Sequence, residues 1–200
     1  MKKILAIIAA TALLLTGCSQ VGAAATVGGT KITQATVQGS IDSILSERGK
    51  VDTSQMQLET GEALNRSQLR FHLFSQILRA IGEEIKIEVT KAEIDTRRAS
   101  ILEQVGGAAA LPSALVGAGI APEDLDTYIE AISYSEKISQ ALIAAGATEE
   151  QVGQEIQNLV VAKSKELGVT INPRYGKWNA ETADIEASDS ASSAVTPSGN

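Results

Sequence analysis

The chain of 200 residues is short of the side chains that many enzymes and metal proteins use. It has one cysteine, Cys18, one histidine, His72, and only 3% aromatic residues. One cysteine cannot form an internal disulfide, and one histidine without further cysteines does not make a typical zinc site. We therefore expect packing alone to stabilise the fold. With so few aromatic residues the core must consist mainly of Leu, Ile, Val and Ala, which suits helices.

Positive charge is also scarce. The chain has 24 acidic and 17 basic residues, which gives a formal net charge of −7 at pH 7. This balance argues against nucleic acid or an anionic lipid surface as a partner. No cofactor and no metal are predicted.

The first residues have the pattern of an export signal. Lys2 and Lys3 precede an apolar run over residues 4–15, which is too short to cross a bilayer. The run ends in Leu-Thr-Gly-Cys at residues 15–18, which resembles a bacterial lipobox. This resemblance implies that residues 1–17 are a lipoprotein signal peptide and that Cys18 carries the lipid. An ordinary secretory signal with a chance cysteine is the alternative.

Acylated Cys18 predicts a protein outside the cytoplasm, anchored by lipid to the cell membrane. Each buried methylene of the lipid contributes about 0.8 kcal/mol, so two or three acyl chains give a durable anchor. Residues 18–24 are then a tether. The sequence does not say which membrane carries the anchor.

The rest of the chain reads as helices between two short strands. A strand with a turn at Gly28-Gly29 is predicted over residues 23–33, and a second strand over residues 169–173. Apolar periodicity, capping residues and stop residues predict the helices between them, at 34–48, 59–84, 90–105, 111–118, 122–145 and 148–167. Thr33 is the expected N-cap of the first helix, and residues 90–93 and 148–151 form expected capping boxes. Residues 179–200 have almost nothing to bury, so we expect a disordered tail.

Two short strands near opposite ends are stable only if they pair with each other or with another chain. Pairing with each other brings the ends of a folded domain at residues 25–178 together. The predicted fold is therefore mainly α.

Five segments in this order resemble the N-terminal chaperone domain of the SurA/PrsA family of extracytoplasmic foldases. They lie at residues 27–33 (VGGTKIT), 87–95 (IEVTKAEID), 104–107 (QVGG), 119–125 (GIAPEDL) and 169–178 (VTINPRYGKW). The resemblance implies a helical lobe clasped by a short two-stranded antiparallel sheet from the two ends of the domain. It also implies an open apolar surface that holds unfolded polypeptides.

One departure from this family limits what the resemblance implies. Larger members carry a parvulin prolyl-isomerase domain before the last helix, but here only residues 144–149 separate the last two helices. Parvulin sites also use histidines, of which this chain has one. The resemblance is therefore to a lipoprotein with a SurA N-terminal domain and no parvulin domain, and isomerase activity is not expected.

No other motif indicates an enzyme. The glycine pairs match no phosphate-binding loop, and no carboxylate pair has the spacing of a hydrolase. His72 lies inside a helix, where it is either a structural residue or a pH sensor. We expect no catalytic residues.

Binding residues are predicted in two places. Apolar side chains of two helices could form opposite walls of a peptide groove: Phe71, Phe74 and Leu78 on one side, and Leu111, Leu115 and Val116 on the other. Alternatively, Phe71 and Phe74 belong to the core. The second place is a partner-facing patch of Arg174, Tyr175 and Trp178, of which the two aromatic residues could instead only cover the sheet edge.

The sequence thus predicts a chaperone-like lipoprotein with no catalysis. Its partners would be unfolded or translocating polypeptides, and the lipid membrane through acylated Cys18. The alternative function is that of a non-catalytic accessory lipoprotein that docks one cell-envelope complex.

The lipid anchor can be tested directly. Metabolic labelling with a radioactive fatty acid is expected to label the wild-type protein, and Cys18→Ser is expected to lose the label because no other thiol exists in the chain. Detergent phase partitioning of the two proteins gives a second readout. A Cys18→Ser protein that keeps the label would contradict the prediction.

Overall fold

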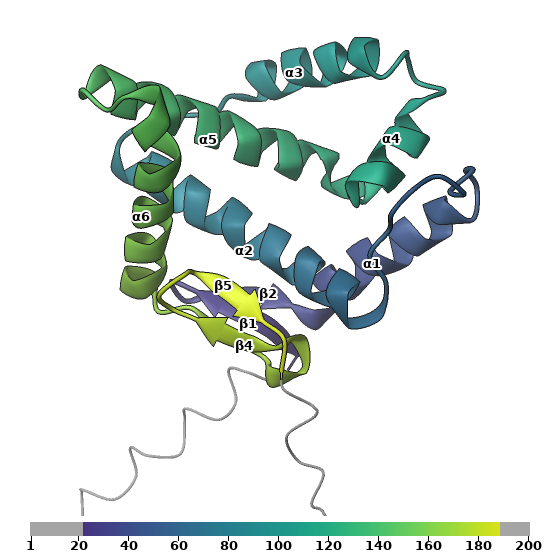
Figure 1. Ribbon diagram of the computed structural model, residues 1–200, viewed down its shortest axis with the longest axis horizontal. Helices are drawn as coiled ribbons and strands as arrows, with labels where there is room; N and C mark the ends of the chain where they lie inside the picture. Colours follow the sequence, from purple (N-terminus) through teal and green to yellow (C-terminus); the bar gives the residue numbers. More distant parts are fainter. Residues whose placement is uncertain (1–21, 189–200) are drawn as a thin grey trace, which may run out of the picture.

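The computed structural model describes residues 22–188. Most of these residues are helical, and strands from the two ends form an antiparallel sheet, so the predicted fold class is confirmed (Figure 1). The α-helices are α1 (Gln34–Arg48), α2 (Gly61–Glu84), α3 (Lys91–Gln104), α4 (Leu111–Ala118), α5 (Leu125–Ala144) and α6 (Glu149–Leu167). The short 3₁₀ turn η1 (Pro122–Asp124) precedes α5. A second one, η2 (Pro173–Tyr175), follows the strand that ends at Ile171.

The sheet joins the two ends of the described chain. Strand β1 (Ala23–Val27) lies between β2 (Thr30–Thr33) and β3 (Thr170–Ile171) and pairs antiparallel with both. The hydroxyl oxygens of Thr26 and Thr170 lie 2.5 Å apart across the β1–β3 pair. The third strand, β2, arises because Gly28 and Gly29 both have positive φ, which suits the tight turn of a hairpin.

A second hairpin corrects the predicted tail. Strands β4 (Lys177–Asn179) and β5 (Asp184–Glu186) pair antiparallel, so the expectation of disorder from residue 179 is wrong for residues 179–188. Ala183 and Ile185 are buried in the core, and Arg70 of α2 holds Asp184 through an ion pair of 2.5 Å. A few buried side chains thus order a segment whose composition is polar. Residues 189–200, Cys18 and the predicted signal peptide lie outside the described residues.

The helix starts follow the predicted caps. Thr33 accepts a hydrogen bond from the backbone N–H of Thr36 at the start of α1. Thr90 and Glu93 form the predicted capping box of α3, in which the Thr90 N–H donates to the Glu93 carboxylate over 2.8 Å. At α6, the Thr148 N–H donates to the Gln151 side chain over 3.0 Å.

Helix α2 is the centre of the main core. Its Leu69, Leu73 and Ile77 are fully buried, and helices α1, α5 and α6 and strand β1 all pack against it. In Figure 1, α2 runs between the sheet and the layer formed by α3 and α5. The apolar face of this helix is broad, so several elements pack against it at once.

Helices α3 and α4 form an arm that is packed less well than the rest. Helix α3 has no buried residue, and its only extensive packing is against α5. A second, smaller apolar cluster lies where α3, α4 and α5 meet. Its buried members are Leu115, Leu125 and Ile129, and its partly buried members are Ile94, Ile101, Leu111, Ile120 and Tyr128.

A close approach of α2 and α5 gives a stability prediction. A Cβ atom added at Gly82 would clash with the ring of Tyr134, so Gly82→Ala forces the ring or one of the two helices to move. We expect a loss of about 1–3 kcal/mol in the free energy of unfolding, as for other overpacked sites.

The matched control is Gly39→Ala, since nothing lies within 4 Å of the added Cβ in α1. It should be neutral or stabilise by up to about 1 kcal/mol, because alanine favours helix. Urea denaturation measures both variants. An equal effect of the two substitutions would contradict the close approach.

Candidate peptide-binding site

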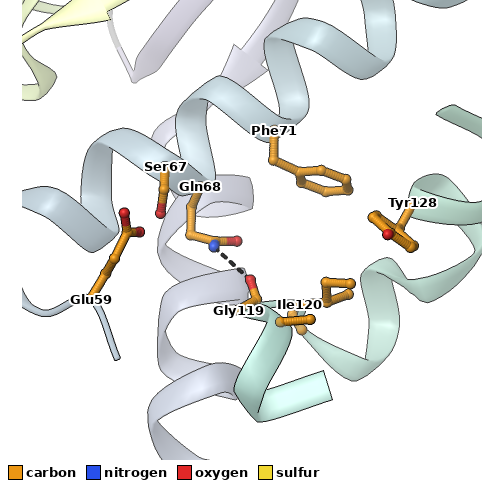
Figure 2. A pocket seen from close by; sticks show the side chains of 9 residues that line it. Glu59, Ser67, Gln68, Phe71, Gly119, Ile120 and Tyr128 are labelled. Carbon is orange, nitrogen blue, oxygen red and sulfur yellow. Dashed lines mark hydrogen bonds between the residues drawn. The ribbon is translucent and has the colours of Figure 1, made fainter. Parts of the chain in front are cut away.

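A pocket of about 180 Å³ opens between α2, the turn after α4 and the start of α5. Phe71 of α2 and Tyr128 of α5 point toward each other across it, and Ile120 lies below them in this view (Figure 2). The remaining lining residues are Glu59, Ser67, Gln68, Ala118, Gly119 and Ala121. The walls are mainly apolar, and Glu59 is the one charged residue in this lining.

A buried hydrogen bond fixes the shape of this pocket. The Gln68 side chain donates to the carbonyl oxygen of Gly119 over 2.9 Å (Figure 2). Gly119 ends α4 in the left-handed conformation, which glycine adopts at low cost. The turn that carries Ile120 is therefore held against α2 by a polar contact.

A second pocket of about 270 Å³ adjoins the first and shares Glu59, Ala118 and Gly119 with it. Arg48 lines this second pocket and donates from Nη1 to the backbone oxygen of Glu59 over 2.8 Å. Its Nε is buried and has no hydrogen-bond partner among the described residues. The two pockets form a short trough along residues 57–59 and 116–120.

Of the six predicted groove residues, only Phe71 lines the first pocket. Leu115 and Val116 are buried, with 6% and 1% exposed, so they do not form the open wall that the sequence suggested. Val116 contributes to the lining of the second pocket only. Leu78 belongs to the main core, and Phe74 packs against that core.

These differences have a common physical reason. Helix α4 packs against α1 and, through Leu111 and Leu115, belongs to the second apolar cluster. Sequence reasoning missed Tyr128, Ile120 and Gln68, which come from three separate segments. The one signal for Tyr128 was the scarcity of aromatic residues, which makes each partly polar ring a candidate for a surface site, and no local pattern indicated Ile120 or Gln68.

The predicted partner patch is also corrected. Tyr175 is buried in the main core, with 4% exposed, and cannot contact a partner. Trp178 is partly buried and packs against that core, while Arg174 is exposed and donates to the Gln34 side chain over 2.9 Å. The alternative, that the aromatic residues cover the sheet, agrees with this arrangement.

His72 belongs to a buried polar cluster. Ser40 Oγ of α1 lies 3.0 Å from His72 Nε2 and donates to the Asp124 carboxylate over 2.6 Å, so the histidine nitrogen is the donor to Ser40. Burial lowers the pKa of His72, and the Asp124 carboxylate, 3.9 Å away, acts in the opposite direction. The cluster ties α1, α2 and η1 together.

This cluster is not arranged as a hydrolase triad. In a triad the carboxylate orients the histidine, which then accepts a proton from an accessible serine. Here the serine donates to the carboxylate instead, and it is buried, with 3% exposed. The arrangement supports a structural role for His72.

Two further observations bear on function. Within residues 22–188, no group of three or more His, Cys, Asp or Glu side chains could hold a metal ion. None of the helices in that range combines the length and hydropathy needed to cross a membrane.

Comparison with known proteins adds no relative. No family model, curated protein or solved structure compared with this chain matches it. The resemblance to the SurA/PrsA family stays a prediction.

The His72 cluster predicts a pH dependence of stability. The pKa of His72 is lowered in the folded protein from an ordinary value of 6.5, so below pH 6.5 the unfolded chain binds more protons. The free energy of unfolding should fall as the pH drops below 6.5, by at most about 1.4 kcal/mol per pH unit for one proton. Chemical denaturation between pH 7.5 and pH 5.5 measures this.

His72→Gln is the control, because glutamine keeps a donor for Ser40 but does not titrate. Its stability should change less over the same pH range. The same pH dependence in both proteins would show that other groups cause it.

Proposed function

We propose that this protein is a membrane-anchored, extracytoplasmic chaperone-like lipoprotein that binds unfolded or translocating polypeptides without catalysis. The observation that supports binding best is the apolar pocket between Phe71 and Tyr128. Its walls come from α2, α5, the turn after α4 and Glu59 in the segment before α2, and a hydrogen bond from Gln68 holds the turn against α2. The anchor rests on the lipobox-like residues 15–18.

The size of the pocket sets the strength of binding. About 180 Å³ accommodates one large apolar side chain of a client polypeptide. Burying one such side chain stabilises a complex by about 1.5–3 kcal/mol, and ordering a flexible chain offsets much of this. Binding is therefore weak and reversible, which lets a holding chaperone release its client without ATP.

Two sets of polar side chains hold elements of the fold together. Ser40 and His72 are buried, and the ion pair of Arg70 with Asp184 holds the β4–β5 hairpin to α2. None of these groups lies in the lining of the apolar pocket. This distribution supports a binding protein over an enzyme.

The proposal is tested by suppression of aggregation. The chain from Ser19 onward, at near-stoichiometric ratio, is expected to reduce light scattering by an unrelated denatured protein. Ala118→Glu places a carboxylate at an exposed position of the pocket lining and should raise the amount needed about fivefold, which corresponds to about 1 kcal/mol of binding.

The matched control is Ala162→Glu, which adds the same charge at an exposed position of α6 outside both pockets. It should act like the wild type, and thermal unfolding should confirm that both variants fold. A wild-type protein that does not suppress aggregation would refute the proposed function. Equal activity of the two variants would place binding elsewhere on the molecule.

A further inference from the structure

Helix α3 packs loosely against α5, which makes it easy to detach from α5. None of its residues is buried, and a groove of about 520 Å³ lies between the two helices. This groove is lined by small or polar side chains, among them Thr96, Ser100 and Ser133. Such an interface holds water and is poorly packed, in contrast to the core around α2.

Ion pairs provide most of the specific contacts between these two helices. Arg97 pairs with Glu136, and Arg98 pairs with Asp126. Lys137 of α5 donates to Glu93 over 2.6 Å and to the backbone oxygen of Glu88 over 2.6 Å. These side chains are 31–54% exposed, so water and salt screen the pairs and each contributes little to stability.

The chain on both sides of α3 has unusual backbone angles. Gly106 and Gly107 follow the helix with φ of 92° and 97°, and Lys86 precedes it with φ of 58°. Two successive glycines with positive φ make a connection that can change direction at low cost. The chain can therefore change direction at the C-terminal end of α3.

Helix α3 covers apolar side chains of α5, and two carboxylates of α5 lie beside them. Ile94 and Ile101 of α3 pack against the second cluster, in which Leu125 and Ile129 of α5 are buried. The carboxylates of Asp126 and Glu136 flank this stripe and pair with the two arginines of α3. When α3 moves away, α5 offers an apolar stripe with the carboxylates of Asp126 and Glu136 and the ammonium group of Lys137 beside it.

We infer that α3 is an internal occupant of a second peptide-binding surface on α5, and that this surface takes amphipathic segments of client polypeptides that carry two adjacent basic residues. The contacts define the segment: apolar residues at the spacing of Ile94 and Ile101, with two basic residues between them where Arg97 and Arg98 stand. At helical spacing these four positions lie on one face. A client with this pattern reproduces the contacts that α3 makes and replaces it.

This inference rests on the proposed function, since it names a class of client and a step that exposes the surface for it. It concerns a surface different from the Phe71–Tyr128 pocket. The acidic excess of the whole chain also favours basic segments over acidic ones.

The test locks α3 in place. In the chain from Ser19 onward, which has no other cysteine, Ser100→Cys and Ser133→Cys place two thiols in the groove between α3 and α5 and leave the ion pairs in place. A short bismaleimide bridges them, and the matched control is the same double variant capped with N-ethylmaleimide. The probe is a fluorescent peptide with the sequence of residues 90–105, measured by anisotropy.

The capped protein is expected to bind this peptide at least tenfold more tightly than the bridged protein. A peptide with Arg97→Glu and Arg98→Glu should bind the capped protein at least fivefold more weakly than the unchanged peptide. Equal affinity of the bridged and capped proteins, equal affinity of the two peptides, or no binding to the capped protein would each overturn the inference.

Aggregation suppression by the unmodified protein separates this result from the proposed function. If that protein suppresses aggregation while the peptide experiment fails, clients bind elsewhere and only the role of α3 is refuted. If it does not suppress aggregation, the proposed function itself fails.

Discussion

The burial of α2 on several sides is the constraint on which the rest of this structure depends. The side chains of Leu69, Leu73 and Ile77 are shielded from water because α1, α5, α6 and β1 all pack around this helix. Strand β1 packs against α2 and pairs with β3, which follows α6 in the chain. The same close packing leaves no room for a side chain at Gly82, where Tyr134 contacts α2.

Within the α3–α4 arm, α4 buries Leu115 and Val116, whereas α3 buries none of its residues. The arm has only a small cluster of its own, built on Leu115, Leu125 and Ile129, and α3 meets α5 largely through exposed charges. Local stability follows the number of buried apolar contacts, so α3 is the part of this arm that opens most readily. The two proposed binding surfaces lie where the main core ends and this arm begins.

Polar contacts fix one part of the region around α3, α4 and the start of α5 and leave α3 free to move. Gln68 holds Gly119, and Ser40 joins His72 to Asp124, so the turn between α4 and α5 is tied to α1 and α2 from two directions. Such contacts are specific in geometry, because a buried group that loses its partner is costly. The Phe71–Tyr128 pocket lies on the fixed side, whereas α3 is held by charges that water can screen.

The sequence by itself determined the local structure, which depends on residues that are close together in the chain. Helix periods, the caps at Thr33, Thr90 and Thr148, and the glycine turn of the first hairpin all follow from contacts within a few positions. Strands as short as the terminal ones need a partner from the same chain or from another chain, and the structure pairs them with each other. Only the tertiary structure decided which apolar residues stay accessible: it buried Leu115, Val116 and Tyr175 and brought Tyr128 to Phe71. Ile185 likewise ordered a polar segment by reaching the core. Burial depends on partners far away along the chain, and local pattern does not contain them.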